Sequence, residues 1–535
     1  MQINLKKLGV GCILICSLLF VQQQSFSQSP KLTPGNWGDR LNGTYKNPVI
    51  NADYSDPDVI KVGKYFYMVC SDFHFMGMPV LRSRDLVNWE IISQIYKRLD
   101  IDPKYNSMEK YGGGSWAPSI RYHKNRFYVY FCTPDEGLYM SSTTDPAGPW
   151  SALTEVKRIK GWEDPCPFWD EDGQAYLGHS QLGAGPIYIH KMSQDGKRLL
   201  DSGKLVYEGP TAEGTKIYKR NGYYYLIIPE GGVATGYETA LRSKNIYGPY
   251  ERRIVLEQGT TKINGPHQGG IVDTDSGETW FMHFQDAGAI GRVTLLEPVK
   301  WVDNWPVMGV DLDGNGVGEP VESYRKPNTN ATGSEFIRTS DDFNQPILAK
   351  QWQWNHNPVN DHWSLKSRKG YLSLTALQSD NHKGARNTIT QKFTGRSGTI
   401  TTLLDVSKMK SGQRAGLCLT GNNPQEVGVL KTDSVLRIYA DNNGNVTLGI
   451  PLLNDKIYLR TTVNLDKTTL LWYSLDNITY KVIGVNCELS GYNYWKAVRP
   501  GLFSYNKNNT GGSASFDWFT YQHDGTTIKA QSIKK

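Results

Sequence analysis

Three acidic residues lead the candidates for chemistry, because each stands just before a similar stretch of chain. They are Asp56 in Ser-Asp-Pro, Asp164 in Glu-Asp-Pro and Glu213 in Ala-Glu-Gly. Two opposed carboxyl groups suit the cleavage of a glycosidic bond, since one can donate a proton to the leaving oxygen while the other activates water or attacks. A third carboxylate near the acid helps to keep it protonated and oriented. The alternative for any one of them is an acid that caps a strand end or a turn.

A hairpin that recurs along the chain must position these acids. After Glu213, a short β-rich run reaches Asn221-Gly222, and an aromatic strand over residues 223–228 returns. Asn-Gly between two β-rich runs is the strongest short hairpin signal. Related hairpins begin at residues 58, 119, 167, 216 and 270, which are 61, 48, 49 and 54 residues apart.

Most of these hairpins are followed by a second strand–turn–strand unit, as in residues 83–90. Two hairpins make a four-stranded sheet, and periods near 50 residues are typical of propeller blades. The pattern predicts an all-β fold with a five-bladed β-propeller over residues 46–325. The alternative is an open sandwich whose segments resemble one another by accident. Because the innermost strands of a propeller surround its axis, the three acids are expected to face one another.

The rest of the chain predicts a second domain and short flanking segments. Lys6-Lys7, an apolar run over residues 8–21 and Ser25-Phe26-Ser27 are typical of a secretory signal peptide over residues 1–27. We therefore expect an exported protein, periplasmic or extracellular. The remaining divisions are a polar lead-in (28–45), a linker (326–335), a β-sandwich of many short strands (336–523) and a polar tail (524–535).

The composition excludes several classes of partner. The 59 Lys and Arg are spread among 52 Asp and Glu without a basic block, which predicts no nucleic-acid partner. Beyond the N-terminal segment no apolar run is long enough to span a bilayer, so no membrane partner is expected. Five of the 7 cysteines lie outside that segment, widely spaced, and predict buried thiols rather than disulfides. The oligomeric state is left open.

Several motifs, in order along the chain, resemble those of glycoside hydrolase family 43. They are residues 55–67, 84–90 and 115–122, Glu163-Asp-Pro, Ala212-Glu-Gly, and residues 291–299 and 303–306. The resemblance covers essentially the whole propeller. It implies an inverting glycosidase with Asp56 as general base, Glu213 as general acid and Asp164 as the modulator of the acid's ionisation. The C-terminal sandwich resembles the lectin-like, concanavalin A-like domain that follows the propeller in β-xylosidase-type members, where it can cap the pocket.

The resemblance also implies roles for four further residues. Phe73 and Trp116 match aromatic positions that line a single-sugar pocket, and Arg292 matches an arginine near the base and the substrate hydroxyls. His267 matches a histidine on the axis that in some members helps to hold a calcium ion. The alternatives are core packing for the two aromatics and a structural role for the histidine. No cofactor is expected for the chemistry, since carboxyl groups can make the proton transfers.

The implied activity is exo-acting release of a terminal pentose, either β-1,4-linked xylose or α-L-arabinofuranose, from hemicellulose glycans such as arabinoxylan or arabinan. Thr215-Lys216 stands where many xylosidase-like members have Pro-His, which leaves the preferred sugar open. Exo-galactanase and endo-arabinanase are alternatives within the family. The rival from another class is a non-catalytic carbohydrate-binding protein, for which Asp56 and Glu213 would be expendable.

Overall fold

The computed structural model describes residues 37–329, 333, 335–489 and 495–525. The predicted signal peptide and most of the predicted polar tail therefore lie outside the described residues. Strands dominate the described part, and its helices are four short 3-10 turns, none of them long and apolar enough to cross a membrane. These turns are η1 (Pro103–Asn106), η2 (Gly288–Ile290), η3 (Asn360–His362) and η4 (His382–Gly384).

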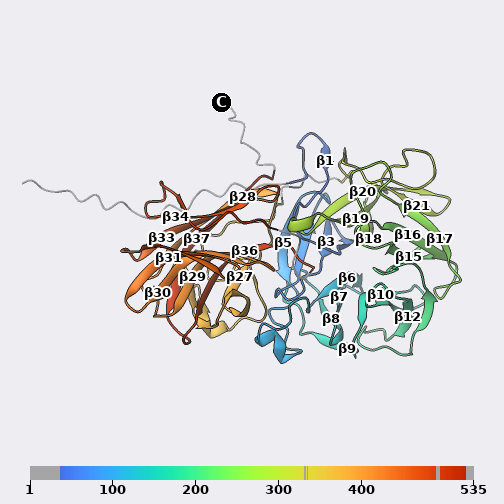
Figure 1. Cartoon of the computed structure of the whole chain (residues 1–535). Coiled ribbons are helices and arrows are strands. Elements are labelled where there is room, and N and C mark those ends of the chain that lie inside the picture. Colours follow the sequence, from blue (N-terminus) through green and yellow to red (C-terminus); the bar gives the residue numbers. More distant parts are fainter. Residues whose placement is uncertain (1–36, 330–332, 334, 490–494, 526–535) are drawn as a thin grey trace, which may run out of the picture. The chain divides into compact units, whose positions relative to one another are not determined.

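Five four-stranded sheets follow one another along the chain, each built from four consecutive strands (Figure 1). This arrangement confirms the predicted five-bladed propeller. The blades are β2 (Asp58–Val62), β3 (Tyr65–Val69), β4 (Pro79–Ser83) and β5 (Trp89–Gln94); β6 (Trp116–His123), β7 (Arg126–Thr133), β8 (Gly137–Thr143) and β9 (Thr154–Arg158); β10 (Trp162–Trp169), β11 (Ala175–Gln181), β12 (Ile187–Met192) and β13 (Lys204–Tyr207); β14 (Lys216–Arg220), β15 (Tyr223–Glu230), β16 (Tyr237–Ser243) and β17 (Glu251–Leu256); and β18 (His267–Asp273), β19 (Thr279–Asp286), β20 (Arg292–Val302) and β21 (Trp305–Met308).

The hairpin at Asn221-Gly222 forms as its sequence predicts. Both residues have positive φ, 51° and 72°, and Arg220 pairs directly with Tyr223 across the two-residue loop. Positive φ at both central positions matches the right-handed twist of the flanking strands, which is why Asn-Gly is favoured there. The turn therefore sets the register of β14 against β15.

The ring closes by packing between its first and last blades. Val59 and Met68 of the first blade share one buried apolar cluster with Val272 and Trp280 of the last. Outside the blades, β1 (Thr44–Lys46) pairs antiparallel with β22 (Ser323–Arg325). The chain segments that enter and leave the propeller are thus hydrogen-bonded to each other.

The C-terminal part forms two further sheets, one of eight strands and one of seven. Apolar side chains such as Leu374, Phe516, Leu417 and Leu502 come from both sheets and share one buried cluster, as a sandwich requires. The first sheet holds β23 (Gln353–Trp354), β26 (Leu377–Gln378), β27 (Thr388–Thr390), β29 (Gln413–Thr420), β30 (Gln425–Thr432), β31 (Val435–Asn442), β32 (Asn445–Pro451) and β36 (Arg499–Asn506), and the second holds β24 (Trp363–Ser364), β25 (Leu372–Thr375), β28 (Ser397–Asp405), β33 (Lys456–Asn464), β34 (Thr469–Ser474), β35 (Lys481–Val482) and β37 (Ser513–His523).

Ion pairs tie the described ends of the predicted linker to the propeller. Lys326 Nζ lies 2.9 Å from Asp39 Oδ2 and 2.6 Å from Asp85 Oδ2, and Glu335 pairs with Arg84 at 3.1 Å. The segment between the two domains is therefore fastened at both of its described ends. The five described cysteines are all buried and free, as predicted.

Candidate active site

The predicted axial residues stand where the first strand of each blade begins. Asp56 lies two residues before β2, Glu213 lies three before β14, and Asp164 lies near the start of β10. One carboxylate oxygen each from Glu163, Asp164 and Glu213 lies within 4.8 Å of the others. The negative charge of Asp56 is close enough to help raise the pKa of Asp164. The structure thus brings together the three predicted acids and a fourth, Glu163.

Asp56 is buried and held at both carboxylate oxygens. Its Oδ1 accepts a 3.1 Å hydrogen bond from Arg292 Nη1, and its Oδ2 accepts one from Ser71 Oγ. Ser71 Oγ in turn accepts a 2.6 Å hydrogen bond from the Ala117 amide, which fixes the hydroxyl. The Asp56 backbone has φ of 55°, a left-handed conformation that a non-glycine residue keeps only under constraint. Such a carboxylate is oriented rather than mobile, as a general base must be.

Asp164 is buried and accepts hydrogen bonds from two neighbours. Ser180 Oγ donates at 3.1 Å and the Gly214 amide at 2.7 Å, both to Oδ2. Burial and, next, the negative charge of Glu213 raise the pKa of Asp164 to about 7. A proton on this carboxyl at neutral pH limits the repulsion among the converging acids.

Glu163 was not among the predicted site residues, although it stands beside Asp164 in the same motif. Its Oε1 accepts a 3.0 Å hydrogen bond from the Ala184 amide. Burial, then the charges of Asp164 and Glu213, raise its pKa to about 9. Glu163 therefore keeps its proton at neutral pH, and Asp164 titrates in that range. Glu163, Asp164 and Glu213 are called here the carboxyl cluster. Neighbouring carboxyl groups that share protons help to keep a general acid protonated.

Glu213 is the member of the cluster that solvent reaches most readily. Its side chain is 20% exposed, whereas Glu163 and Asp164 are each 4% exposed. Glu213 Oε1 lies 3.1 Å from Nε2 of His267, a buried residue at the start of β18. Accessibility suits a group that must reach the leaving oxygen of a substrate.

The residues around His267 are a poor match for direct calcium coordination. Calcium prefers six to eight oxygen ligands, whereas this side chain offers nitrogen and already faces Glu213. The ring of Phe284 lies 5.1 Å from the imidazole, centroid to centroid. A role in orienting the Glu213 carboxyl fits the geometry better, and no catalytic step is assigned to a metal.

Phe73 and Trp116 form an aromatic pair beside these carboxyls. Their ring centroids are 5.2 Å apart, and Trp116 Nε1 donates a 2.9 Å hydrogen bond to the Gly112 carbonyl. Phe73 is buried with φ of 51°, while Trp116 is half-buried. The burial of Phe73 fits core packing. Trp116 keeps some exposed surface, and its contact with a sugar stays a prediction.

Lys216, which marks the departure from the xylosidase-like motif, is fully buried. Its Nζ donates to the Pro118 carbonyl at 3.1 Å and to Ser119 Oγ at 2.8 Å. The residue therefore links the fourth blade to the second. This structural role explains how a lysine fits at that position. The positive charge of Lys216 also acts on Asp164, whose pKa it lowers against the larger effect of burial.

Comparison with known proteins agrees with the geometry. Residues 45–306 match the model of glycosyl hydrolases family 43, and residues 340–522 match that of the beta xylosidase C-terminal concanavalin A-like domain. A protein of Xylanibacter ruminicola described as a putative beta-xylosidase is 53% identical over 88% of this chain and 88% of its own length. A beta-xylosidase of Formosa agariphila is 37% identical over 92% of this chain and 93% of its own.

A solved structure shows the same two-domain fold. It is described as a bifunctional GH43-CE protein of Bacteroides eggerthii, and it is 31% identical with a TM-score of 0.81. The match covers 93% of this chain and 64% of that protein.

Proposed function

Because this chain belongs to glycosyl hydrolase family 43, we propose that it is an exo-acting, inverting glycosidase that releases terminal β-1,4-linked xylose from hemicellulose-derived oligosaccharides. The observation that carries the proposal is the convergence of Asp56, which is paired with Arg292, and the carboxyl cluster. We propose xylose rather than arabinofuranose as the released sugar because the two relatives above are described as beta-xylosidases. Release of α-L-arabinofuranose from arabinoxylan or arabinan is the second candidate.

In the proposed reaction Asp56 accepts a proton from a water molecule as that water attacks the anomeric carbon. Glu213 gives its proton to the glycosidic oxygen, so the bond to the leaving sugar breaks as the bond to water forms. Asp164 lies next to Glu213 and modulates the ionisation of this acid. Its Oδ2 also accepts the hydrogen bond of the Gly214 amide and so orients the loop that carries Glu213. Since water attacks from the face opposite the leaving group, the configuration at the anomeric carbon inverts.

No cofactor takes part in this chemistry, because carboxyl groups carry both proton transfers. For His267 we propose that the side chain orients the Glu213 carboxyl instead of binding calcium. Chelation with EDTA is accordingly expected to leave turnover unchanged, whereas a loss that added calcium restores would return the metal to the site. Export through residues 1–27, with action in the periplasm or outside the cell, completes the proposal and is testable by N-terminal sequencing of the secreted protein.

The deciding experiment compares the intact enzyme with its Glu213→Ala and Asp56→Ala variants. Xylobiose, 4-nitrophenyl β-xyloside and 4-nitrophenyl α-arabinofuranoside serve as substrates. Loss of general acid or base catalysis is expected to lower turnover of xylobiose by about 10²–10⁴-fold. For Glu213→Ala the loss should be smaller with the nitrophenyl substrate, because nitrophenolate leaves without needing a proton.

Three outcomes separate the alternatives. Proton NMR of the first product should show α-xylose if the mechanism inverts, and β-xylose would contradict inversion. Preference for the arabinofuranoside would select the second candidate. A third result would favour the carbohydrate-binding protein. The intact protein would bind sugar but cleave no glycoside, polymer or galactoside, and both variants would bind sugar equally well.

A further inference from the structure

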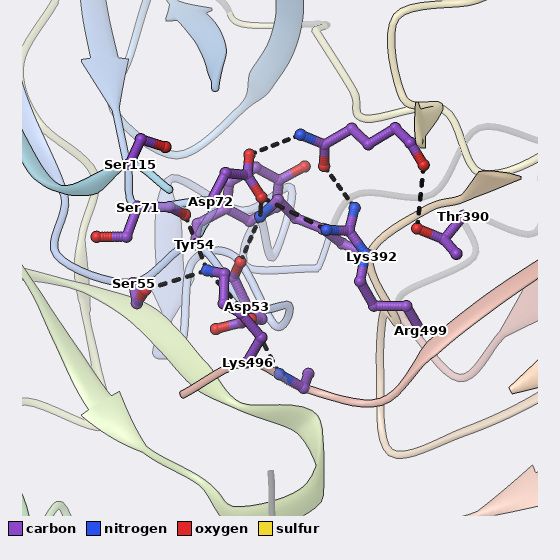
Figure 2. A network of polar contacts seen from close by, with 12 residues as sticks. Asp53, Tyr54, Ser55, Ser71, Asp72, Ser115, Thr390, Lys392, Lys496 and Arg499 are labelled. Atoms are coloured by element: carbon purple, nitrogen blue, oxygen red, sulfur yellow. Dashed lines mark hydrogen bonds and ion pairs between the residues drawn. The ribbon is translucent and has the colours of Figure 1, made fainter. Parts of the chain in front are cut away.

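Charged residues from both domains meet in a buried network (Figure 2). The propeller supplies Asp53 and Asp72, and the sandwich supplies Lys392, Lys496 and Arg499; these five residues are called here the interdomain charge network. Lys496 Nζ lies 3.3 Å from Asp53 Oδ2, and Lys392 Nζ lies 3.0 Å from Asp72 Oδ1. Arg499 Nη1 lies 3.4 Å from the same Asp72 oxygen. None of the five is more than 7% exposed.

Such a network is costly to bury, so stability alone is a weak reason for it. Removing charges from water carries a large desolvation penalty, and well-packed apolar residues often replace buried ion pairs without loss of stability. Here three basic side chains face two acidic ones, so the two kinds are not matched in number. A buried ionic arrangement of this kind is better suited to fixing geometry, because each charge must find its partner for the domains to dock.

The two network carboxylates stand next to two strained positions of the site. Asp72 directly precedes Phe73, and Asp53 lies three residues before Asp56. Phe73 and Asp56 both have left-handed backbones, with φ of 51° and 55°. Such conformations persist in non-glycine residues only where the surroundings over-determine them. Asp53 and Asp72, close to these two positions in the chain, are each bound to a lysine of the sandwich.

Lys496 connects the network most directly with the base. Its Nζ donates to the Ser71 carbonyl at 2.8 Å and to Ser55 Oγ at 3.2 Å, and it lies 5.2 Å from the centroid of the Phe73 ring. Ser55 precedes Asp56 in the chain, and the Ser71 hydroxyl donates to the Asp56 carboxylate. Asp53, moreover, accepts a 3.1 Å hydrogen bond from the amide of Arg292, whose side chain binds the other oxygen of Asp56.

From these contacts we propose that Lys496 of the sandwich is a positioning residue for the catalytic base. It holds Ser55 and Ser71, and through them the Asp56 carboxylate, in the orientation that activates water. The sandwich is then an integral part of the catalytic apparatus and not only a cap or a sugar-binding module. This inference rests on the proposed role of Asp56 as base.

The test is a double-mutant cycle of Lys496→Met and Ser71→Ala in the full-length enzyme, measured as kcat and KM on xylobiose. Misplacing a catalytic group by about 1 Å can cost about 10²-fold in rate, so each single variant is expected to lower kcat by about 10- to 100-fold with KM changed by less than about 3-fold. If Lys496 acts through Ser71, the double variant should be no slower than the slower single variant. Independent effects would multiply instead.

Lys326→Met is the matched control, because Lys326 also bridges two carboxylates but does so away from the carboxyls of the site. It should lower the melting temperature and leave kcat unchanged. If Lys496→Met does not fold, Ser55→Ala is measured in its place. That variant deletes only the hydroxyl that Lys496 reaches and is expected to lower kcat by about 3-fold or more at an unchanged melting temperature.

A crystal structure of Lys496→Met gives a readout that does not depend on turnover. The inference expects the Ser71–Asp56 hydrogen bond to be lost and the Asp56 backbone to leave its left-handed conformation. Multiplicative effects in the cycle, or an Asp56 unchanged in that structure, would overturn it. Failure of the intact enzyme to cleave any glycoside would instead refute the proposed function, and the crystal structure would still decide the positioning role.

Discussion

The amide of Gly214 donates a 2.7 Å hydrogen bond to Asp164 Oδ2, so the residue that follows the proposed acid is bound to the carboxyl that modulates it. The backbone that follows Glu213 is therefore tied to Asp164. The same two residues interact electrostatically, since the charge of Glu213 helps to raise the pKa of Asp164. The loop that carries the acid is thus coupled to Asp164 by a hydrogen bond and by charge, and this coupling leads to the first prediction.

We predict that kcat/KM falls as the pH rises through about 7. The pKa of Asp164 is raised to about 7, so this carboxyl loses its proton in that range and no longer offers it next to the proposed acid. A pH–rate profile from pH 4 to 9 measures this limb. Asp164→Asn, which removes the titrating group, should lower kcat/KM by about 10²-fold and abolish a limb at that pH. A wild-type profile that stays flat to pH 9 would contradict the assignment.

A second prediction concerns stability. The pKa of Glu163 is raised from 4.5 to about 9, so folding keeps a proton that the unfolded chain releases above about pH 4.5. Below that pH both states are protonated and Glu163 carries no penalty; as pH rises toward 9 the penalty grows. Glu163→Gln should therefore raise the melting temperature more at pH 8 than at pH 5.

Differential scanning fluorimetry at the two pH values measures this difference. Glu171→Gln is the control, because the Glu171 side chain is 88% exposed and its replacement should have the same small effect at both. An equal stabilisation by Glu163→Gln at pH 5 and pH 8 would show that Glu163 ionises normally in the folded protein.

Trp116 is predicted to bind the sugar ring through its exposed part. Trp116→Ala should lower kcat/KM by about 10-fold, mainly through KM, since an aromatic contact contributes about 0.5–1.5 kcal/mol beyond area burial. The matched control is Trp169→Ala, whose indole likewise donates to a backbone carbonyl, that of Gln194, at 3.0 Å. If both variants change KM equally, the effect comes from general loosening of the propeller.

Arg292 is predicted to act by orienting Asp56 rather than by its charge alone. Arg292→Lys keeps the charge but cannot reproduce the planar guanidinium that places Nη1 3.1 Å from Asp56 Oδ1, so kcat should fall by about 10- to 100-fold. Arg220→Lys, which alters the more exposed pair with Asp273 at 2.8 Å, should leave kcat unchanged. Full activity of Arg292→Lys would show that the positive charge at this position is sufficient and that the guanidinium geometry is not required.

Much of the propeller could be predicted because its signals are local. The Asn221-Gly222 turn, the aromatic return strand and the recurrence of both along the chain depend only on neighbouring residues. The acids could be located for the same reason, since each precedes its own hairpin. Their roles in catalysis remain predictions until the variants above are measured.

Glu163 escaped prediction because alternation along a strand places adjacent side chains on opposite faces. The structure breaks that rule: the register shifts between Glu163 and Cys166, and Asp164 has φ of 56°. This irregularity brings the carboxylate oxygens of both acids close to Glu213, within the 4.8 Å that joins the cluster. A β-bulge next to a site changes the direction of side chains in this way, and the local residue pattern does not predict it.

The sequence by itself therefore determined the all-β class, the five blades and the identity of three converging acids, because hairpin turns and strand periodicity are encoded by residues close together in the chain. Only the tertiary structure decided what surrounds them. The contact between Lys496 and Ser55 joins residues 441 positions apart, and a single buried lysine carries no local sign of its partner. Burial, which raises the pKa values of Glu163 and Asp164, likewise arises only when the blades close around the axis.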